Sequence, residues 1–308
     1  MKTPWWFGHK TPLAFMLVPV SWVYWAASRL VYKIRGFRAY TSRRPVICIG
    51  NILAGGVGKT PIVRALANEF DAPVVCRGYK KGAKTGNIGD EAAMLAADGL
   101  QVHTGNRRAN VMLLDRQADN TPIIMDDGYQ NPTVKKTVSV LVFDESVGMG
   151  NGFLLPAGPL RQGRRAISGA DAVIVIKSGA PARKNFMLPT NIPVFYAHTK
   201  TVSPYSRATK VVAFAGIGYP KKFFRALPGV VATRSFADHH QYTDGEIAAL
   251  YKLAARRGAK LVTTQKDWMR LGAADREKIK YAELKIDIDN AFFEWLRGKT
   301  NADTEKKG

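Results

Sequence analysis

From Pro45 onward, short apolar runs alternate with longer stretches of helical periodicity. Several runs are rich in Val and Ile without regular alternation of apolar and polar residues, which is typical of strands covered on both faces. We expect strands at residues 45–50, 73–76, 121–125, 138–143, 172–176, 193–197, 211–215 and 260–264. We expect helices at residues 60–70, 90–98, 106–117, 219–226, 244–257 and 290–297. Alternating strands and helices predict a doubly wound α/β fold with a mostly parallel sheet.

A polar stretch at residues 198–209 contains Pro204 and has no hydrophobic period, which favours a domain boundary there. A new strand–turn–helix pattern begins after it. We therefore expect three parts. They are an N-terminal apolar and basic segment over residues 1–35, a main α/β domain over residues 36–200, and a smaller C-terminal α/β domain over residues 201–308.

The N-terminal part has an unusual pattern of its own. Residues 11–28 carry no charge, aromatic residues crowd the stretch from Trp5 to Tyr24, and basic residues lie on both sides. Eighteen uncharged residues are the lower limit for a bilayer span, and two prolines weaken a straight one. Aromatic rings and basic flanks suit a segment that lies in or dips into an anionic leaflet, so we expect membrane association. The alternatives are a buried core helix, a cleaved signal peptide and an organellar transit peptide.

Charge and cysteine content narrow the function classes. The 308 residues include 46 Lys and Arg but only 24 Asp and Glu, which gives a formal charge of +22. This excess indicates an anionic partner: nucleic acid, an anionic membrane surface or a phosphorylated substrate. Cys48 and Cys76 are the only cysteines in the sequence and form no metal-ligand pattern. A disulfide framework and a structural zinc site are therefore not expected, and a reducing compartment is favoured.

A phosphate-binding loop is the strongest chemical signal. Residues 46–61 read VICIGNILAGGVGKTP, an apolar strand that leads into a glycine-rich turn and then a helix. Backbone N–H groups and a helix N-terminus in this context cradle phosphates, while Lys59 reaches the β and γ oxygens and the Thr60 hydroxyl binds Mg²⁺. The strict motif places Gly where this chain has Leu53. The expected ATP-binding residues of the loop are Ala54, Gly55, Gly56, Val57, Gly58, Lys59, Thr60 and Pro61.

An acidic pair supplies the expected metal ligands. Asp126 and Asp127 follow an apolar run and precede a glycine, so they are predicted to lie at a strand end. Adjacent carboxylates repel each other unless a cation lies beside them, and phosphate-loop enzymes hold Mg²⁺ with such a carboxylate. We expect this pair, with Thr60, to bind Mg²⁺. An ordinary turn is the alternative.

A series of motifs resembles one enzyme family over roughly residues 10 to 297. In order, they are VICIGNILAGGVGKTP (46–61), CRGY (76–79), GDEAAML (89–95), DDGYQNP (126–132), LLPAGPLR (154–161), FADHHQY (236–242) and TTQKD (263–267). Together with the apolar N-terminus, they resemble tetraacyldisaccharide 4′-kinase, the lipid A 4′-kinase of Gram-negative bacteria. The resemblance implies transfer of the ATP γ-phosphate to the 4′-hydroxyl of a lipid A disaccharide 1-phosphate, at the cytoplasmic face of the inner membrane.

The resemblance also implies roles for single residues. Asp90 matches the family's catalytic base, His239 matches the histidine that partners it, and Arg77 matches the arginine of its RGY motif. The chain departs from the family at Asn131, where His is usual, and at Gln162, where Glu is frequent. Both departures remove an ionisable group and keep hydrogen bonding.

Several of these residues have structural alternatives. Asp90 precedes an Ala-rich run and is also in place to cap a helix. His239 and His240 are alternatively a hydrogen-bonded surface pair. The basic stretch between Asp71 and Asp90, with Arg77, is either a phosphate clamp or a solvated loop.

The leading hypothesis is therefore a membrane-associated, Mg²⁺- and ATP-dependent kinase that acts on an acidic glycolipid. The first alternative is a phosphate-loop ATPase or GTPase of the metallochaperone or partitioning type, for which the same GGVGKT core would serve. A nucleic-acid-binding protein is the second alternative, but the sequence carries no signature of such a module.

Overall fold

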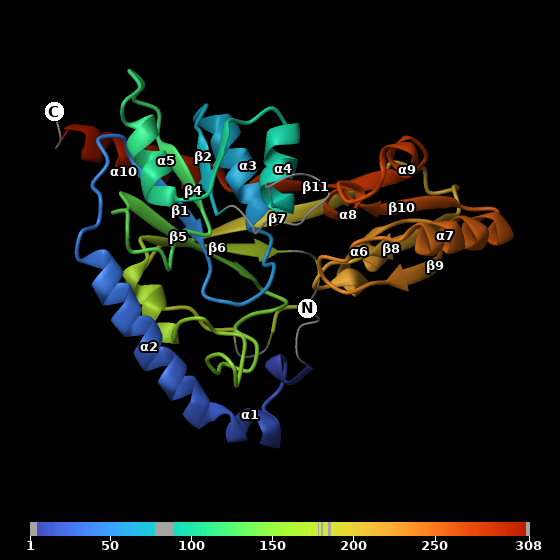
Figure 1. The fold of residues 1–308 in the computed structure, drawn as a ribbon, viewed down its shortest axis with the longest axis horizontal. Helices are drawn as coiled ribbons and strands as arrows, with labels where there is room; N and C mark the ends of the chain where they lie inside the picture. The colour runs from blue at the N-terminus through green and yellow to red at the C-terminus, as the bar shows by residue number, and fades with distance from the viewer. Residues whose placement is uncertain (1–4, 78–88, 178, 180, 184–185, 306–308) are drawn as a thin grey trace. The chain divides into compact units, whose positions relative to one another are not determined.

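The computed structural model describes residues 5–77, 89–177, 179, 181–183 and 186–305 (Figure 1). The chain folds into two compact units. The larger unit lies within residues 4–79, 95–199 and 286–308, and the smaller unit within residues 80–94 and 200–285.

The larger unit is built on a parallel sheet in the order β3-β2-β4-β1-β5-β6-β7. Its strands are β1 (Val46–Gly50), β2 (Val74–Cys76), β3 (Val102–Thr104), β4 (Ile123–Asp126), β5 (Val138–Asp144), β6 (Ala172–Lys177) and β7 (Val194–Val202). Strand β1 lies between β4 and β5, with Ile47 opposite Ile124 on one side and Val138 on the other. This central position places the end of β1, where the phosphate loop begins, in the middle of the sheet.

Helices cover both faces of this sheet. Ile47 and Ile49 of β1 pack in one core with α3 (Lys59–Glu69) and α10 (Asn290–Glu305). Val46 and Cys48 of the same strand pack in a second core with α5 (Arg107–Leu114). Both faces of β1 are therefore buried, which explains why the strand has no polar alternation.

The smaller unit repeats this design on a smaller scale. Its sheet has the order β11-β10-β8-β9, and each neighbouring pair of strands is parallel. Its strands are β8 (Val211–Ala215), β9 (Val230–Ser235), β10 (Lys260–Thr264) and β11 (Lys280–Ile288). Helix α7 (Asp244–Arg257) packs on one face and α6 (Pro220–Ala226) on the other. The short helices α8 (Gln265–Trp268) and α9 (Ala273–Lys278) follow β10, and α4 (Asp90–Ala97) begins in this unit.

The N-terminal segment of the larger unit is helical. A 3₁₀ turn, η1 (Trp5–Phe7), precedes α1 (Pro12–Met16) and α2 (Val18–Gly36), and α2 runs along the outside of this unit (Figure 1). Ser21 is the only buried side chain of α2, and it donates to the Leu154 carbonyl at 3.0 Å. The alternative of a buried core helix is therefore wrong. In the part of the chain that the structure describes, no helix combines the length and the apolar character needed to cross a bilayer.

The predicted fold class, a mostly parallel α/β sheet, is confirmed, and so are the eight predicted strands. Three further strands, β3, β9 and β11, had not been predicted. Strand β3 has only three residues, and the burial of β9 and β11 is partial because they carry charged side chains. The two units also differ from the expected ranges, since residues 89–94 belong with the smaller unit and residues 286–305 with the larger one. The physical reason is that Phe292 and Leu296 are buried in its core.

Candidate functional site

The phosphate loop joins β1 to α3, and the two ends of the loop are fixed differently. At the helix end, Gly58 has φ +83°, a left-handed conformation that a side chain would strain, and it precedes Lys59 at the start of α3. At the strand end, the segment that contains LLPAGPLR pairs with the loop. The Ala54 N–H donates to the Pro159 carbonyl at 2.7 Å, and the Arg161 N–H donates to the Ile52 carbonyl at 2.7 Å. These two hydrogen bonds therefore fix the backbone at the strand end of the loop.

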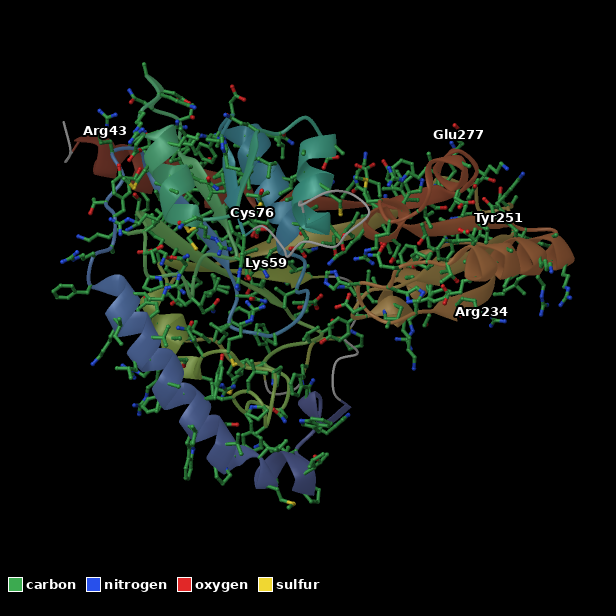
Figure 2. The ribbon with its side chains drawn as sticks, viewed as in Figure 1. Arg43, Lys59, Cys76, Arg234, Tyr251 and Glu277 are labelled. Carbon is green, nitrogen blue, oxygen red and sulfur yellow. The ribbon has the colours of Figure 1, made fainter. Side chains whose placement is uncertain are left out.

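Three charged side chains meet beside this loop. Lys59 Nζ lies 3.1 Å from Asp127 Oδ1, and Arg161 Nη1 lies 3.0 Å from Asp127 Oδ2. Lys59, which Figure 2 labels, is only 11% exposed, whereas the Asp127 and Arg161 side chains are each about one-third exposed. The site thus holds two cations around one carboxylate, with an opening toward solvent.

The charges set the ionisation of Asp127. Burial favours the neutral carboxyl, but the charges and hydrogen bonds of Lys59 and Arg161 outweigh burial and lower the pKa of Asp127 to about 2. Asp127 is therefore a carboxylate at any physiological pH. The LLPAGPLR motif by itself gives Arg161 no role, because Arg161 meets Asp127 only in the folded chain, 34 positions away in the sequence.

The backbone of the acidic pair is held by a buried arginine. Asp126 ends β4, and Asp127 follows it with φ +48°, an uncommon conformation for a residue with a side chain. Arg107, at the first position of α5, donates from Nη2 to the carbonyls of Asp126 and Asp127 at 2.7 and 3.1 Å. A Cβ on the next residue, Gly128, would lie 2.4 Å from the Met125 sulfur, so only glycine fits there. Sequence reasoning missed Arg107, because a single arginine at a helix start is not a specific signal.

The residues expected to hold Mg²⁺ have suitable chemistry. Asp126 is buried at the end of β4, Asp127 is ionised, and Thr60 is the second residue of α3. All three offer oxygen atoms, which Mg²⁺ prefers, and one or two carboxylates plus substrate phosphates are its usual ligands. The residues present therefore fit this ion.

The two departures from the family pattern are both used as neutral hydrogen-bonding groups. Asn131 Oδ1 accepts from the N–H and the hydroxyl of Thr133 at 2.8 and 2.7 Å. Gln162 Oε1 accepts from Gln130 Nε2 at 3.2 Å, and the same nitrogen donates to the Asn51 carbonyl at 2.7 Å. These contacts stabilise the turns around the phosphate loop without an ionisable group.

A second cluster lies within the smaller unit. His239 Nδ1 lies 3.1 Å from Asp90 Oδ2, so the structure brings together two residues separated by 149 positions in the sequence. Asp90 is the first residue of α4, and within the described chain no N–H of this helix donates to its carboxylate. Its side chain contacts His239 and Arg270 instead, which is not the geometry of a capping residue. His239 has φ +59°, and its N–H donates to the Gly216 carbonyl at 3.1 Å.

Arg270 completes this cluster, and sequence reasoning had not identified it. Its Nε and Nη2 atoms donate to Asp90 Oδ2 at 2.9 and 2.5 Å. Burial raises the pKa of Asp90, but the hydrogen bonds from His239 and Arg270 and the charge of Arg270 hold it well below its usual range. The nearest motif in the sequence is TTQKD, but it ends three residues before Arg270 and does not include it.

His240 has a structural role. Its Nε2 lies 3.0 Å from Glu246 Oε2, and its ring stacks on Phe236 at a centroid distance of 4.8 Å. Glu246 in turn forms the capping box of α7 with Thr243. The two adjacent histidines therefore differ: His239 faces Asp90, whereas His240 fixes the turn that carries His239.

Arg77 is exposed directly after β2, and no described contact assigns it a ligand-binding role. The remaining basic residues of the expected phosphate clamp, from Lys80 to Lys84, lie outside the described residues.

Comparisons with known proteins agree on one family. Residues 13–301 match the family described as tetraacyldisaccharide-1-P 4′-kinase. A tetraacyldisaccharide 4′-kinase of Phenylobacterium zucineum is 35% identical in a match that covers 91% of this chain and 93% of that protein. One of Parvibaculum lavamentivorans is 39% identical in a match that covers 91% of this chain and 90% of that protein. The fold is similar to that of LpxK from Aquifex aeolicus, solved in complex with ATP, with a TM-score of 0.72 at 22% identity over 95% of this chain and 99% of that one.

Proposed function

Because this chain belongs to the tetraacyldisaccharide 4′-kinase family, we propose that it transfers the γ-phosphate of ATP to the 4′-hydroxyl of a lipid A disaccharide 1-phosphate. The observation that carries this proposal is the arrangement of Lys59 and Arg161 around Asp127 beside the phosphate loop. Two cations at the start of a helix form a site for a polyphosphate. No observation favours the ATPase or GTPase alternative.

The larger unit supplies the nucleotide chemistry. In phosphoryl transfer the transition state is loose, so the protein acts mainly by positioning groups and by stabilising negative charge. Backbone N–H groups of the loop and the N-terminus of α3 bind phosphate oxygens, and Lys59 neutralises charge on the β and γ oxygens. Asp127 contacts both Lys59 and Arg161 and so holds these two cations beside the phosphate loop. We propose that Thr60, Asp126 and Asp127 hold Mg²⁺, which when bound neutralises charge on the transferred phosphoryl group.

The smaller unit supplies the proposed base. Asp90 is ionised and 14% exposed, so it can accept the proton that the attacking hydroxyl loses. His239 Nδ1, 3.1 Å from Asp90 Oδ2, holds the carboxylate in place, and His239 Nε2 lies 4.0 Å from Asp238 Oδ1. We propose that Asp90 and His239 act as a pair.

The N-terminal helices are proposed to bind the membrane that contains the lipid substrate. Large apolar side chains are exposed along α1 and α2, including Met16 at 76%, Trp22 at 67%, Val23 at 70% and Ile34 at 66%. Figure 2 shows side chains along the outer side of α2 that project away from the larger unit. An exposed apolar patch of this size marks an interaction surface, and basic residues in the last turn of α2 suit anionic headgroups. Because the reaction consumes ATP, we place the protein at the cytoplasmic face of the inner membrane.

The experiment that tests the proposed function compares ADP production with and without the acceptor. A kinase produces ADP in proportion to added disaccharide 1-phosphate, because the acceptor hydroxyl is the nucleophile. An ATPase produces ADP at the same rate when the lipid is omitted, and that result would overturn the proposal.

A further inference from the structure

The carboxylate of Asp90 is contacted unevenly. Arg270 donates to Oδ2 from Nε at 2.9 Å and from Nη2 at 2.5 Å, and His239 Nδ1 lies 3.1 Å from the same oxygen. Within the described chain, no hydrogen bond reaches Oδ1. A base needs one oxygen with a free lone pair, and this pattern leaves Oδ1 as that oxygen.

Arg270 is itself rigidly held. Its side chain is 1% exposed, and its Nη1 donates to Asp267 Oδ1 at 3.0 Å and to the Gly216 carbonyl at 3.2 Å. A guanidinium with so many fixed partners has one available orientation. Because the guanidinium is planar and rigid, it also fixes the orientation of the Asp90 carboxylate that it binds.

Asp267 provides the anchor for this arginine. It is fully buried, its Oδ1 also accepts from the Gly216 N–H at 3.1 Å, and its Oδ2 accepts from the Thr264 hydroxyl at 2.7 Å. Gly216 also accepts from the His239 N–H. Asp267 of the TTQKD motif therefore holds Arg270 directly and His239 through Gly216.

We propose that Arg270 is a positioning residue for the phosphoryl-transfer reaction, which fixes Asp90 through Oδ2 so that Oδ1 accepts the proton of the substrate hydroxyl. This inference rests on the proposed function, since Arg270 can position the base only if Asp90 is that base. A strong ion pair weakens a base, but in a loose transition state the hydroxyl proton is lost late, so the orientation of the carboxylate matters more than its basicity.

Arg270→Met tests this role, because Met keeps much of the apolar length of the side chain and removes the fork. Among the residues that the structure describes, the titratable and charged groups that face Asp90 are His239, Arg270 and Lys266. Lys266 also pairs with Glu91 at 3.3 Å, and His239 Nε2 lies 4.0 Å from Asp238 Oδ1. Burial raises the pKa of Asp90 and Arg270 lowers it, so the pKa of Asp90 should rise when Arg270 is removed. The acid limb of the kcat–pH profile should move to higher pH, and kcat should fall about 10²-fold, within the range of a lost general base. The KM for ATP should stay within about twofold, because the loss belongs to the transition state.

Arg276→Met is the matched control, because Arg276 caps nearby carbonyls of the same segment and has no described contact with Asp90. It should leave the pH profile unchanged. Arg270→Lys keeps the charge without the fork, so its acid limb should lie between those of the wild type and Arg270→Met while kcat stays reduced. If Arg270→Met does not fold, the Lys variant decides the question alone.

A wild-type pH profile with kcat within about threefold of wild type in Arg270→Met, or in Arg270→Lys if only that variant folds, would overturn the inference. Asp90→Asn separates this failure from that of the proposed base. If Asp90→Asn is also active, the base assignment itself is wrong. If Asp90→Asn is inactive and the Arg270 variants are normal, only the role of Arg270 is wrong.

Discussion

Asp127 and Asp90 are both carboxylates held in the ionised form, but their partners give them different uses. Asp127 lies between Lys59 and Arg161, and both of its oxygens are taken by cations. Among the described residues, His239 and Arg270 both contact Asp90 through the same oxygen, Oδ2. The first arrangement suits electrostatic positioning of phosphate groups and a metal ion, and the second suits proton transfer.

Lys59→Ala should reduce turnover by at least about 10²-fold, because it removes the cation that we propose neutralises the charge developing in the transition state. Lys177 offers a matched control, since it is a lysine of the same unit that lies over the ring of Tyr196 at 4.2 Å. Initial rates of lipid phosphorylation measure the effect. Near-normal rates in Lys59→Ala, or an equal loss in Lys177→Ala, would contradict the assignment.

Asp90→Asn should lower kcat by about 10² to 10⁴-fold, because an amide cannot accept the proton at neutral pH. ATP affinity, measured by equilibrium binding, should change little, since the nucleotide residues belong to the larger unit. If Asp90 served only at the helix end, Asn would be nearly equivalent, with a cost of a few tenths of a kcal/mol. Turnover above about a third of wild type would exclude Asp90 as the base.

At the scale of elements, α2 differs from the other helices in what it exposes. Its buried stripe is narrow, and Ser21 binds the backbone of the LLPAGPLR segment through the Leu154 carbonyl and the Ala157 N–H. That segment also pairs with the phosphate loop. The apolar helix and the nucleotide site of the larger unit therefore share one supporting loop.

Replacement of Trp22, Val23 and Ile34 by Ser should weaken binding to anionic vesicles, because these exposed side chains are the proposed contact with lipid. Each fully buried side chain contributes about 1.5–3 kcal/mol, so the triple variant should lose at least about 10-fold in partition coefficient. Vesicle co-sedimentation measures this. Leu113→Ser and Met187→Ser, at exposed apolar positions elsewhere in the same unit, should bind as the wild type does. Unchanged binding of the triple variant would show that α2 does not face lipid.

Strands that are buried on both faces could be predicted from the sequence, since β1, β5 and β8 consist largely of apolar residues. The strands that were missed are short or partly exposed, and their pattern resembles that of loops. The phosphate loop was predicted because all its parts are adjacent in sequence. The places of Arg161, Arg107 and Arg270 in these clusters were not predicted, because each arginine joins its cluster through a contact with a residue at least 19 positions away.

At the scale of the whole molecule, the charge of +22 matches the proposed partners, which are all anionic. ATP, the disaccharide 1-phosphate and an anionic membrane surface all carry negative charge, and a basic protein increases its rate of encounter with each. Salt should therefore slow the reaction at low substrate concentration more than at saturation. Measurement of kcat/KM and kcat over a range of ionic strength tests this, and equal sensitivity of the two would contradict steering by charge.

The central claim is that this chain phosphorylates the 4′-hydroxyl of a lipid A disaccharide 1-phosphate. The most direct test is mass spectrometry of that lipid after incubation with the full chain and Mg·ATP, with fragmentation to locate the new phosphate. We predict a product with one additional phosphate on the distal sugar of the wild-type reaction and none with Lys59→Ala. Unchanged lipid from a folded, ATP-binding wild-type protein, or a phosphate on any other hydroxyl, would contradict the account.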